Sequence, residues 1–202
     1  MPETTGLRAA GAARTRRNIL DATRRHLVEA GFHRLSLEQV AADAGVTRVT
    51  VYRRFGSKLG LLDAVAEDVA DRARVVVRMR RAAETPDPVS AFRTMVAELC
   101  RFWSVDPIVL RRLISLAAVD PEAREVLEGR DGWRYERVAE FVRRLDADGR
   151  LRTGFDLDQA VAAVGVITGF PACDELATRL GARLDTLDRM VIPLLAGVVR
   201  LD

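Results

Sequence analysis

The most constraining feature of the sequence is a pair of short amphipathic segments within residues 36–58. In the first segment, apolar residues recur at the spacing that places them on one face of a helix. Gly45 follows and tolerates the positive φ at which helices commonly end. We therefore predict a short helix that ends at Gly45 and has an apolar stripe of Leu37, Val40, Ala41 and Ala44.

The second segment begins at Thr47, whose hydroxyl can cap a helix. Val51 and Phe55 are four residues apart and therefore face inward together. The polar and basic residues between them are left on the opposite face. Two short helices joined by a glycine-containing turn, the second with a polar and basic outward face, predict a helix-turn-helix.

Charge is distributed unevenly along the chain. Residues 1–58 carry eleven Arg and Lys against five Asp and Glu, a net charge of +6, whereas the whole chain carries +3. A basic N-terminal quarter on an acidic remainder predicts that a polyanion meets the N-terminal end. The helix-turn-helix at the same place makes double-stranded DNA the expected partner.

The rest of the sequence predicts an all-α chain, since no segment alternates as a strand does. We expect a head over residues 1–58, with residues 1–13 as a mobile tail and a first helix from Arg14 or Thr15 to Ala30. Residues 59–202 form a helical body, whose first helix, residues 59–82, connects it to the head. That helix has no glycine or proline after Gly60, so we expect it to be continuous, with an inner face of Leu62, Val65, Val69, Ala73 and Val76.

Further helices are expected from Val89 onward. One is expected to be interrupted near residues 129–132, one to bend within residues 156–180, and the last to start at Asp185. The start of the chain lacks an apolar leader, and the longest apolar run is shorter than the ~20 residues that span a bilayer, so we expect a soluble, cytoplasmic protein without membrane contact.

Neither the cysteines nor the histidines indicate a metal site or a catalytic site. Cys100 and Cys173 lie far apart without metal-ligand spacing, which predicts two reduced, buried thiols and leaves a redox pair as the alternative. His26 and His33 are the only histidines, and both lie in the head. The chain has no nucleophile–base order, metal cluster or phosphate loop, so we predict no enzyme activity, no metal and no cofactor.

Residues 45–59 resemble the recognition-helix signature of the TetR family of repressors. The match includes Thr50, Tyr52, Phe55, Ser57 and Lys58 in their expected order, and the clear likeness covers about the first 65 residues. Val49 and Arg54 depart from the family pattern. The resemblance implies an all-α fold: an N-terminal three-helix bundle with the helix-turn-helix, and a larger helical body for ligand binding and dimerisation.

Roles on DNA follow from side-chain chemistry on the outward face. Arginine can pair with guanine through two hydrogen bonds, and an apolar side chain can meet a thymine methyl group. We expect base-edge contacts from Arg48, Val49, Thr50 and Arg53. Phosphate contacts are expected from Thr47, Tyr52, Lys58, Arg14 and Arg17.

The resemblance also implies a small-molecule effector and a homodimer. The few charges on the apolar faces of the body predict a mostly apolar or aromatic effector. The candidate pocket residues, for each of which a core position is the alternative, are Met95, Leu99, Phe102, Trp103, Leu113, Leu116, Trp133 and Phe170. A four-helix bundle built from the last two helices of each subunit would use Val161, Val164, Leu176, Leu187, Val191, Leu194, Leu195 and Val198.

Two other functions remain open at this point. One is a dimeric helical interaction module that has lost DNA binding. The other is an activator that has no release by an inducer, whereas the expected repressor would be released from DNA by its ligand.

Overall fold

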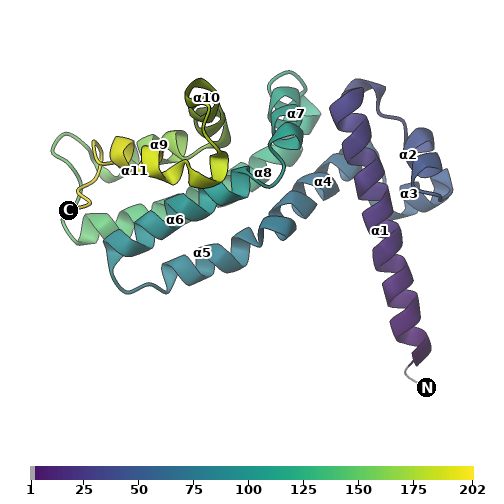
Figure 1. Cartoon of the computed structure of the whole chain (residues 1–202), viewed down its shortest axis with the longest axis horizontal. Coiled ribbons are helices and arrows are strands. Elements are labelled where there is room, and N and C mark those ends of the chain that lie inside the picture. Colours follow the sequence, from purple (N-terminus) through teal and green to yellow (C-terminus); the bar gives the residue numbers. More distant parts are fainter. Residues whose placement is uncertain (1–2) are drawn as a thin grey trace. The chain divides into compact units, whose positions relative to one another are not determined.

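The computed structural model describes the backbone of residues 3–202 and the side chains of residues 9–202. Over this range the regular structure is helical, apart from one isolated antiparallel bridge between Leu151 and Val199. The all-α prediction is therefore confirmed (Figure 1). The first helices are α1 (Glu3–Glu29), α2 (Leu37–Asp43), α3 (Arg48–Phe55), α4 (Lys58–Ala73) and α5 (Val75–Ala83), with the 3-10 turn η1 (Phe32–Arg34) after α1. They are followed by α6 (Pro88–Trp103), α7 (Pro107–Ala117), α8 (Pro121–Ala147), α9 (Leu157–Ile167), α10 (Phe170–Leu180), the 3-10 turn η2 (Leu184–Thr186) and α11 (Asp188–Leu195).

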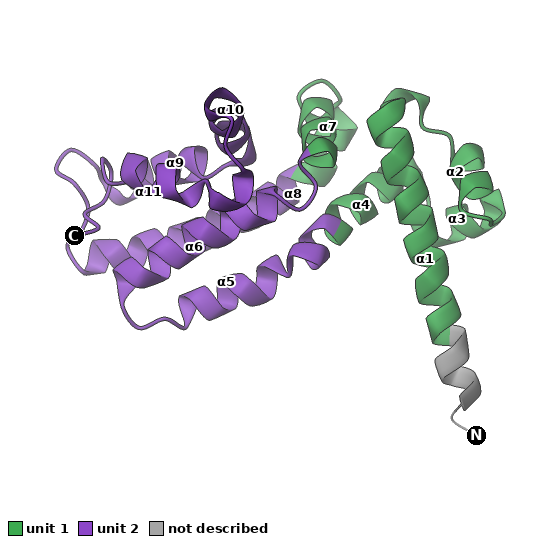
Figure 2. Ribbon diagram, in the orientation of Figure 1, with its two compact units in different colours: residues 1–68, 108–127 green, residues 69–107, 128–202 purple. Residues whose placement is uncertain are grey.

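These elements form two compact units, coloured separately in Figure 2. Unit 1 comprises residues 1–68 and 108–127, and unit 2 comprises residues 69–107 and 128–202. The sequence prediction divided the chain at residue 58, whereas residues 59–68 and 108–127 group with the head. The reason is packing, since the first turns of α4 bury Leu61, Leu62 and Val65 in unit 1.

The first helix starts earlier than the sequence predicts. It begins at Glu3, so residues 3–13 are helical where a mobile tail was expected. The first two residues of that tail lie outside the described part of the chain. Alanine-rich sequence favours this extension, because alanine has the highest helix propensity.

The core of unit 1 joins α1, α2, α3 and α4. Ile19 and Leu20 of α1 and Val51 of α3 are fully or almost fully buried. Short helices such as α2 and α3 are marginal in isolation. The packing of α2 and α3 against each other, and of α2 against α1, therefore has to supply most of their stability.

The connector helix is broken at Arg74, which corrects the prediction of one helix over residues 59–82. Arg74 adopts φ 53° and ψ 35°, and its N–H donates to the Asp71 carbonyl at 2.9 Å. A left-handed conformation in a non-glycine residue costs ~1–2 kcal/mol. Three valines follow, and their branched side chains lower helix propensity at this point.

The break also changes which residues face inward. Val76, predicted on the inner face, is 53% exposed, whereas Val75, Met79 and Ala82 are buried. The prediction assumed one continuous helix through Arg74, and it therefore placed the wrong side of α5 against the core.

Unit 2 is built around α6, which packs against α5, α10 and α11. Phe92, Met95 and Leu99 of α6 are almost completely buried. The helix α8 runs through residues 129–132 without the expected interruption. The expected bend within residues 156–180 is confirmed, because α9 and α10 meet at 48°.

In the part of the chain that the structure describes, no single helix is both long and apolar enough to cross a bilayer. Only α9 and α10 taken together, with their bend, have the length and composition for that.

The two cysteines meet in the core of unit 2, although 73 positions separate them in the sequence. Cys100 lies on α6 and Cys173 on α10, and both are buried. A hydrogen bond with Cys173, together with burial, raises the pKa of the Cys100 thiol. This proton therefore stays on Cys100 at neutral pH, which keeps that thiol a weak nucleophile.

Gly60 permits the close approach of α3 and α4. A Cβ atom at Gly60 would lie 1.8 Å from the carbonyl oxygen of Phe55, a backbone atom that cannot rotate away. We predict that Gly60→Ala lowers the free energy of unfolding of unit 1 by about 2 kcal/mol or more. Urea denaturation followed by circular dichroism measures this change.

Gly129 provides the matched control. It lies inside α8, and a Cβ there would meet nothing within 4 Å. Gly129→Ala should leave stability unchanged or raise it by up to ~1 kcal/mol, because alanine favours helix. Equal stability of the Gly60→Ala variant and the native chain would contradict the close packing.

Candidate nucleic-acid interface

The predicted helix-turn-helix is present as α2, a short turn and α3. The hydroxyl of Ser36 accepts a hydrogen bond from the Glu38 N–H at 3.3 Å and so begins α2. Gly45 has φ 66°, the conformation expected at the end of this helix. Val46 is half-buried and its N–H donates to the Ala41 carbonyl at 2.9 Å. The turn is therefore fixed by backbone bonds and one apolar contact.

Thr47 caps α3 as predicted. Its side-chain oxygen accepts from the Thr50 N–H at 3.2 Å, and the two threonine hydroxyls are 3.0 Å apart. The Thr50 side chain is half-buried. Its hydroxyl therefore takes part in the cap, which reduces what Thr50 can offer to a base.

The outward face of α3 carries the remaining predicted base-reading residues. Val51 is fully buried, whereas Val49 is 64% and Tyr52 63% exposed. Arg48 and Arg53 are exposed on the same short helix. Val49 and Tyr52 thus share the exposed side of α3 with two arginines, an arrangement that suits a surface that meets a partner.

Arg54 is an exposed cation that the sequence analysis did not assign. It follows Arg53 in the last turn of α3, where a positive charge also favours the helix dipole. The only sequence signal for it was the Arg-Arg pair itself, and this signal was read as a departure from the family pattern.

The residues predicted to contact phosphates differ in whether their side chains already have partners within the protein. Arg14 and Arg17 are exposed on α1. Lys58, the one lysine of the chain, donates from Nζ to the His33 carbonyl at 3.2 Å and lies 5.5 Å from the centre of the Phe32 ring. Lys58 thus connects the start of α4 to the turn after α1, so it has a structural role in the free protein.

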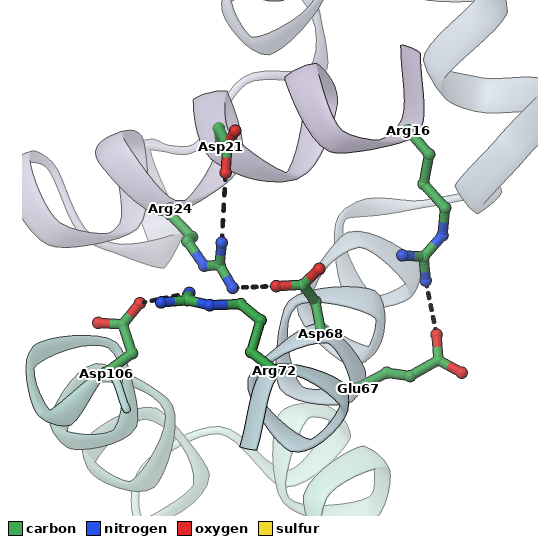
Figure 3. A network of polar contacts seen from close by, with 7 residues as sticks. All are labelled: Arg16, Asp21, Arg24, Glu67, Asp68, Arg72 and Asp106. Carbon is green, nitrogen blue, oxygen red and sulfur yellow. Dashed lines mark hydrogen bonds and ion pairs between the residues drawn. The ribbon is translucent and has the colours of Figure 1, made fainter. Parts of the chain in front are cut away.

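Ion pairs fasten α1 to α4 within unit 1, as Figure 3 shows. Arg24 pairs with Asp68, and Arg16 pairs with Glu67 at 2.7 Å. The Arg24 and Asp68 side chains are only 13% and 18% exposed, so their bond is shielded from water. These bonds orient the helix that carries Arg14 and Arg17 relative to the helix that follows α3.

Two further polar contacts were missed because they join distant parts of the sequence. His26 on α1 lies 3.0 Å from the Asp43 carboxylate at the end of α2. Within unit 2, Arg72 pairs with Asp106 at 3.5 Å. Pairings of this kind depend on the packing of helices, which periodicity does not give.

The predicted pocket residues are divided between the two units. Leu113 and Leu116 are buried in unit 1. In unit 2, the Trp103 ring contacts Phe102 at 4.4 Å and Phe170 at 5.6 Å between ring centres, and its Nε1 donates to the Thr168 carbonyl at 2.9 Å. The structure therefore brings three of the predicted aromatic residues together. Met95 and Leu99 are buried on the same helix as Trp103, and Trp133 is half-buried on α8.

A buried arginine that the sequence did not single out also lies in unit 2. Arg134 on α8 is 6% exposed. It donates to the Asp131 carboxylate and to the Gly165 carbonyl, both at 2.8 Å. Its guanidinium also lies 4.5 Å from the centre of the Tyr135 ring. These contacts account for its burial.

Most of the residues predicted for a dimer interface instead fill the subunit's own core. Such buried side chains cannot contact a second subunit. The apolar periodicity of the last helix therefore reflects packing inside the subunit. Leu194 is 54% exposed, and Val161 and Leu176 are half-buried. The buried residues are Val164, Leu187, Val191, Leu195 and Val198.

One family model matches part of this chain. Residues 19–65 match the model for bacterial regulatory proteins of the tetR family. The solved structure of NalD from Pseudomonas aeruginosa, described as the secondary repressor of the MexAB-OprM multidrug efflux pump, is similar over 94% of this chain and 98% of that chain, with a TM-score of 0.70 and 26% identity.

Two curated relatives are similar over shorter stretches. The HTH-type transcriptional regulator AlkX of Mycobacterium tuberculosis is 32% identical over 111 residues, which cover 55% of this chain and 53% of AlkX. The nucleoid occlusion factor SlmA of Photorhabdus laumondii is 25% identical over 156 residues, which cover 74% of this chain and 76% of that protein.

Proposed function

We propose that this chain is a repressor of the TetR family of bacterial transcriptional regulators. It binds operator DNA as a homodimer, and a small, mostly apolar effector releases it from the DNA. One observation carries the proposal. The short, capped helix α3 buries Val51 and holds Arg48, Val49 and Arg53 in solvent. The likeness to NalD, which is described as a repressor, supports repression over activation.

Sequence reading is assigned to the exposed face of α3. Arg48 and Arg53 offer paired donors that match the acceptors of guanine in the major groove. Val49 offers an apolar surface to a thymine methyl group. Thr50 contributes less than the sequence suggested, since its hydroxyl is engaged with Thr47. Phosphate binding is assigned to Arg14, Arg17, Arg54, Thr47 and Tyr52, with Lys58 in a supporting role.

We predict that Arg48→Ala and Arg17→Ala weaken DNA binding in different ways. Loss of Arg48 should remove ~1–3 kcal/mol of discrimination at one base position in each half-site. Loss of Arg17 should weaken specific and random DNA alike and reduce the salt dependence of binding by about one counterion per subunit. Fluorescence anisotropy against a panel of single-base operator variants, at two salt concentrations, separates the two effects.

Both residues are exposed, so circular dichroism should show that each variant is folded. An Arg48→Ala variant that loses equal affinity for specific and random DNA would contradict the assignment of base reading to α3.

A homodimer is proposed because one eight-residue helix reads few bases, whereas a two-fold pair reads two half-sites. The interface is assigned to apolar residues of α9, α10 and α11 that remain in solvent. These are Val166, Leu180, Met190 and Leu194, which are 46–61% exposed. Their exposure on one subunit supports a covering partner.

We predict that Leu194→Asp weakens the dimer at least ~10-fold, since burying a leucine contributes ~1.5–3 kcal/mol and 1.4 kcal/mol is tenfold. Size-exclusion chromatography with light scattering at micromolar concentrations measures the change. Val119→Asp is the control, because Val119 is 73% exposed and lies outside the proposed interface. A Leu194→Asp variant that remains as dimeric as the control would place the interface elsewhere.

The effector is proposed to bind near the aromatic cluster of Phe102, Trp103 and Phe170 in unit 2. These rings form an apolar cluster, and the half-buried Phe102 is the most accessible of them.

We predict that an apolar or aromatic compound present at 100 times its Kd raises the melting temperature by roughly 5–10 °C, because it stabilises the folded state by ~2.7 kcal/mol. Differential scanning fluorimetry measures the shift, and Phe102→Leu should reduce it. The same compound should release operator DNA. A compound that stabilises the native chain and the variant equally, without releasing DNA, would contradict effector binding at this cluster.

A further inference from the structure

A groove of about 180 Å³ lies on unit 2, between α5 and α6. Three arginines line it, Arg74, Arg78 and Arg81, and Glu98 of α6 is the one acidic residue in its wall. The groove therefore carries more positive than negative charge. Its lining residues include none of the aromatic cluster of Phe102, Trp103 and Phe170.

The arginines share one side of α5 because of their spacing. Arg74, Arg78 and Arg81 are at positions i, i+4 and i+7, which align along a helix. Arg74 occupies the position just before α5, where the break in the connector ends α4. Val75, the residue after Arg74, thus starts α5, and the side of α5 that carries the arginines faces the groove.

The one carboxylate of the groove is already shared. Arg78 donates from Nη1 to both Glu98 oxygens at 3.2 Å, and Arg101 pairs with the same carboxylate at 3.2 Å. The Nε of Arg78 is buried without a hydrogen-bond partner. Within the described part of the chain, Arg74 and Arg81 have neither an ion pair nor a side-chain hydrogen bond.

Two other arginines of unit 2 differ from Arg74 and Arg81 in having several partners. Arg144 donates to the carbonyls of Ala83, Thr85 and Pro86, and Arg134 to Asp131 and Gly165. The buried Nε of Arg78 is an unpaired donor, which is unfavourable in a folded protein, whereas Arg74 and Arg81 are exposed and without a partner among the described residues. An oxyanion supplies acceptors for several guanidinium groups at once, and arginine binds phosphate through paired hydrogen bonds.

We propose that this groove is a binding site for the phosphate group of a small anionic molecule, held by Arg74, Arg78 and Arg81. Its volume holds about six water molecules at ~30 Å³ each, which is enough for one phosphate. Pockets that enclose a drug-sized ligand are larger, at ~300–1,000 Å³. The groove therefore takes the charged group and leaves the remainder of the molecule in solvent. Val77 and Ala82 add apolar wall to the groove.

Isothermal titration calorimetry with sodium pyrophosphate, at an ionic strength held constant with chloride, tests the site. The full chain should bind one pyrophosphate per subunit. Arg81→Ala should weaken this binding about tenfold, the effect of losing one charge-assisted hydrogen bond. Arg80→Ala is the matched control, because Arg80 is exposed on the same helix and does not line the groove. This control should bind within about twofold of the native chain.

Equal losses in Arg80→Ala and Arg81→Ala, or no binding at constant ionic strength, would overturn the proposal. Circular dichroism checks that both variants are folded. Parallel titrations with glycerol 3-phosphate and with inorganic phosphate distinguish the sources of the phosphate. Tighter binding than inorganic phosphate, still dependent on Arg81, indicates a phosphorylated organic molecule, and equal binding indicates the free ion. Both of these results support the site, which does not depend on the proposed DNA and effector functions.

Discussion

The structure of the head depends on how an eight-residue helix is held in place. A helix of this length is not stable in water by itself. The buried side chain of Val51 anchors α3, the Thr47 side chain accepts a hydrogen bond from the Thr50 N–H, and Gly60 allows α4 to follow closely. Because packing and capping use the inner face and the start of α3, the outer face remains free for Arg48, Val49 and Arg53.

The dependence of α3 on a cap and a few buried side chains also explains why the head could be predicted from sequence. Its signals are local: a glycine with positive φ, a capping threonine and two apolar residues one turn apart. Each determines backbone geometry within a few residues, and both the cap at Thr47 and the positive φ of Gly45 are present. The roles of individual side chains were harder to predict. Lys58 bonds to the His33 carbonyl, and Thr50 bonds to Thr47, and neither contact has a sequence signal beyond proximity to the motif.

The body could be predicted only as helical. The break at Arg74 has no glycine or proline to mark it, so the helical period was carried through and Val76 was placed on the wrong face. Apolar periodicity in the last helix identified Leu187, Val191 and Leu195 but did not distinguish a subunit core from a dimer interface. The contact of Cys100 with Cys173 and the burial of Arg134 depend on helix packing across long stretches of chain. The proposed phosphate groove arises from the same cause, since the break sets the face on which the arginines of α5 lie.

Sequence-specific DNA binding is the central claim, and one titration tests it most directly. Fluorescence anisotropy would compare the DNA upstream of the protein's own gene with random DNA of equal length, at two salt concentrations. The account predicts tighter binding to the upstream DNA, by at least ~10³-fold at physiological salt, with a salt dependence that reflects the phosphate contacts alone. Equal and steeply salt-dependent binding to both DNAs would mean that α3 reads no bases, and it would contradict the account.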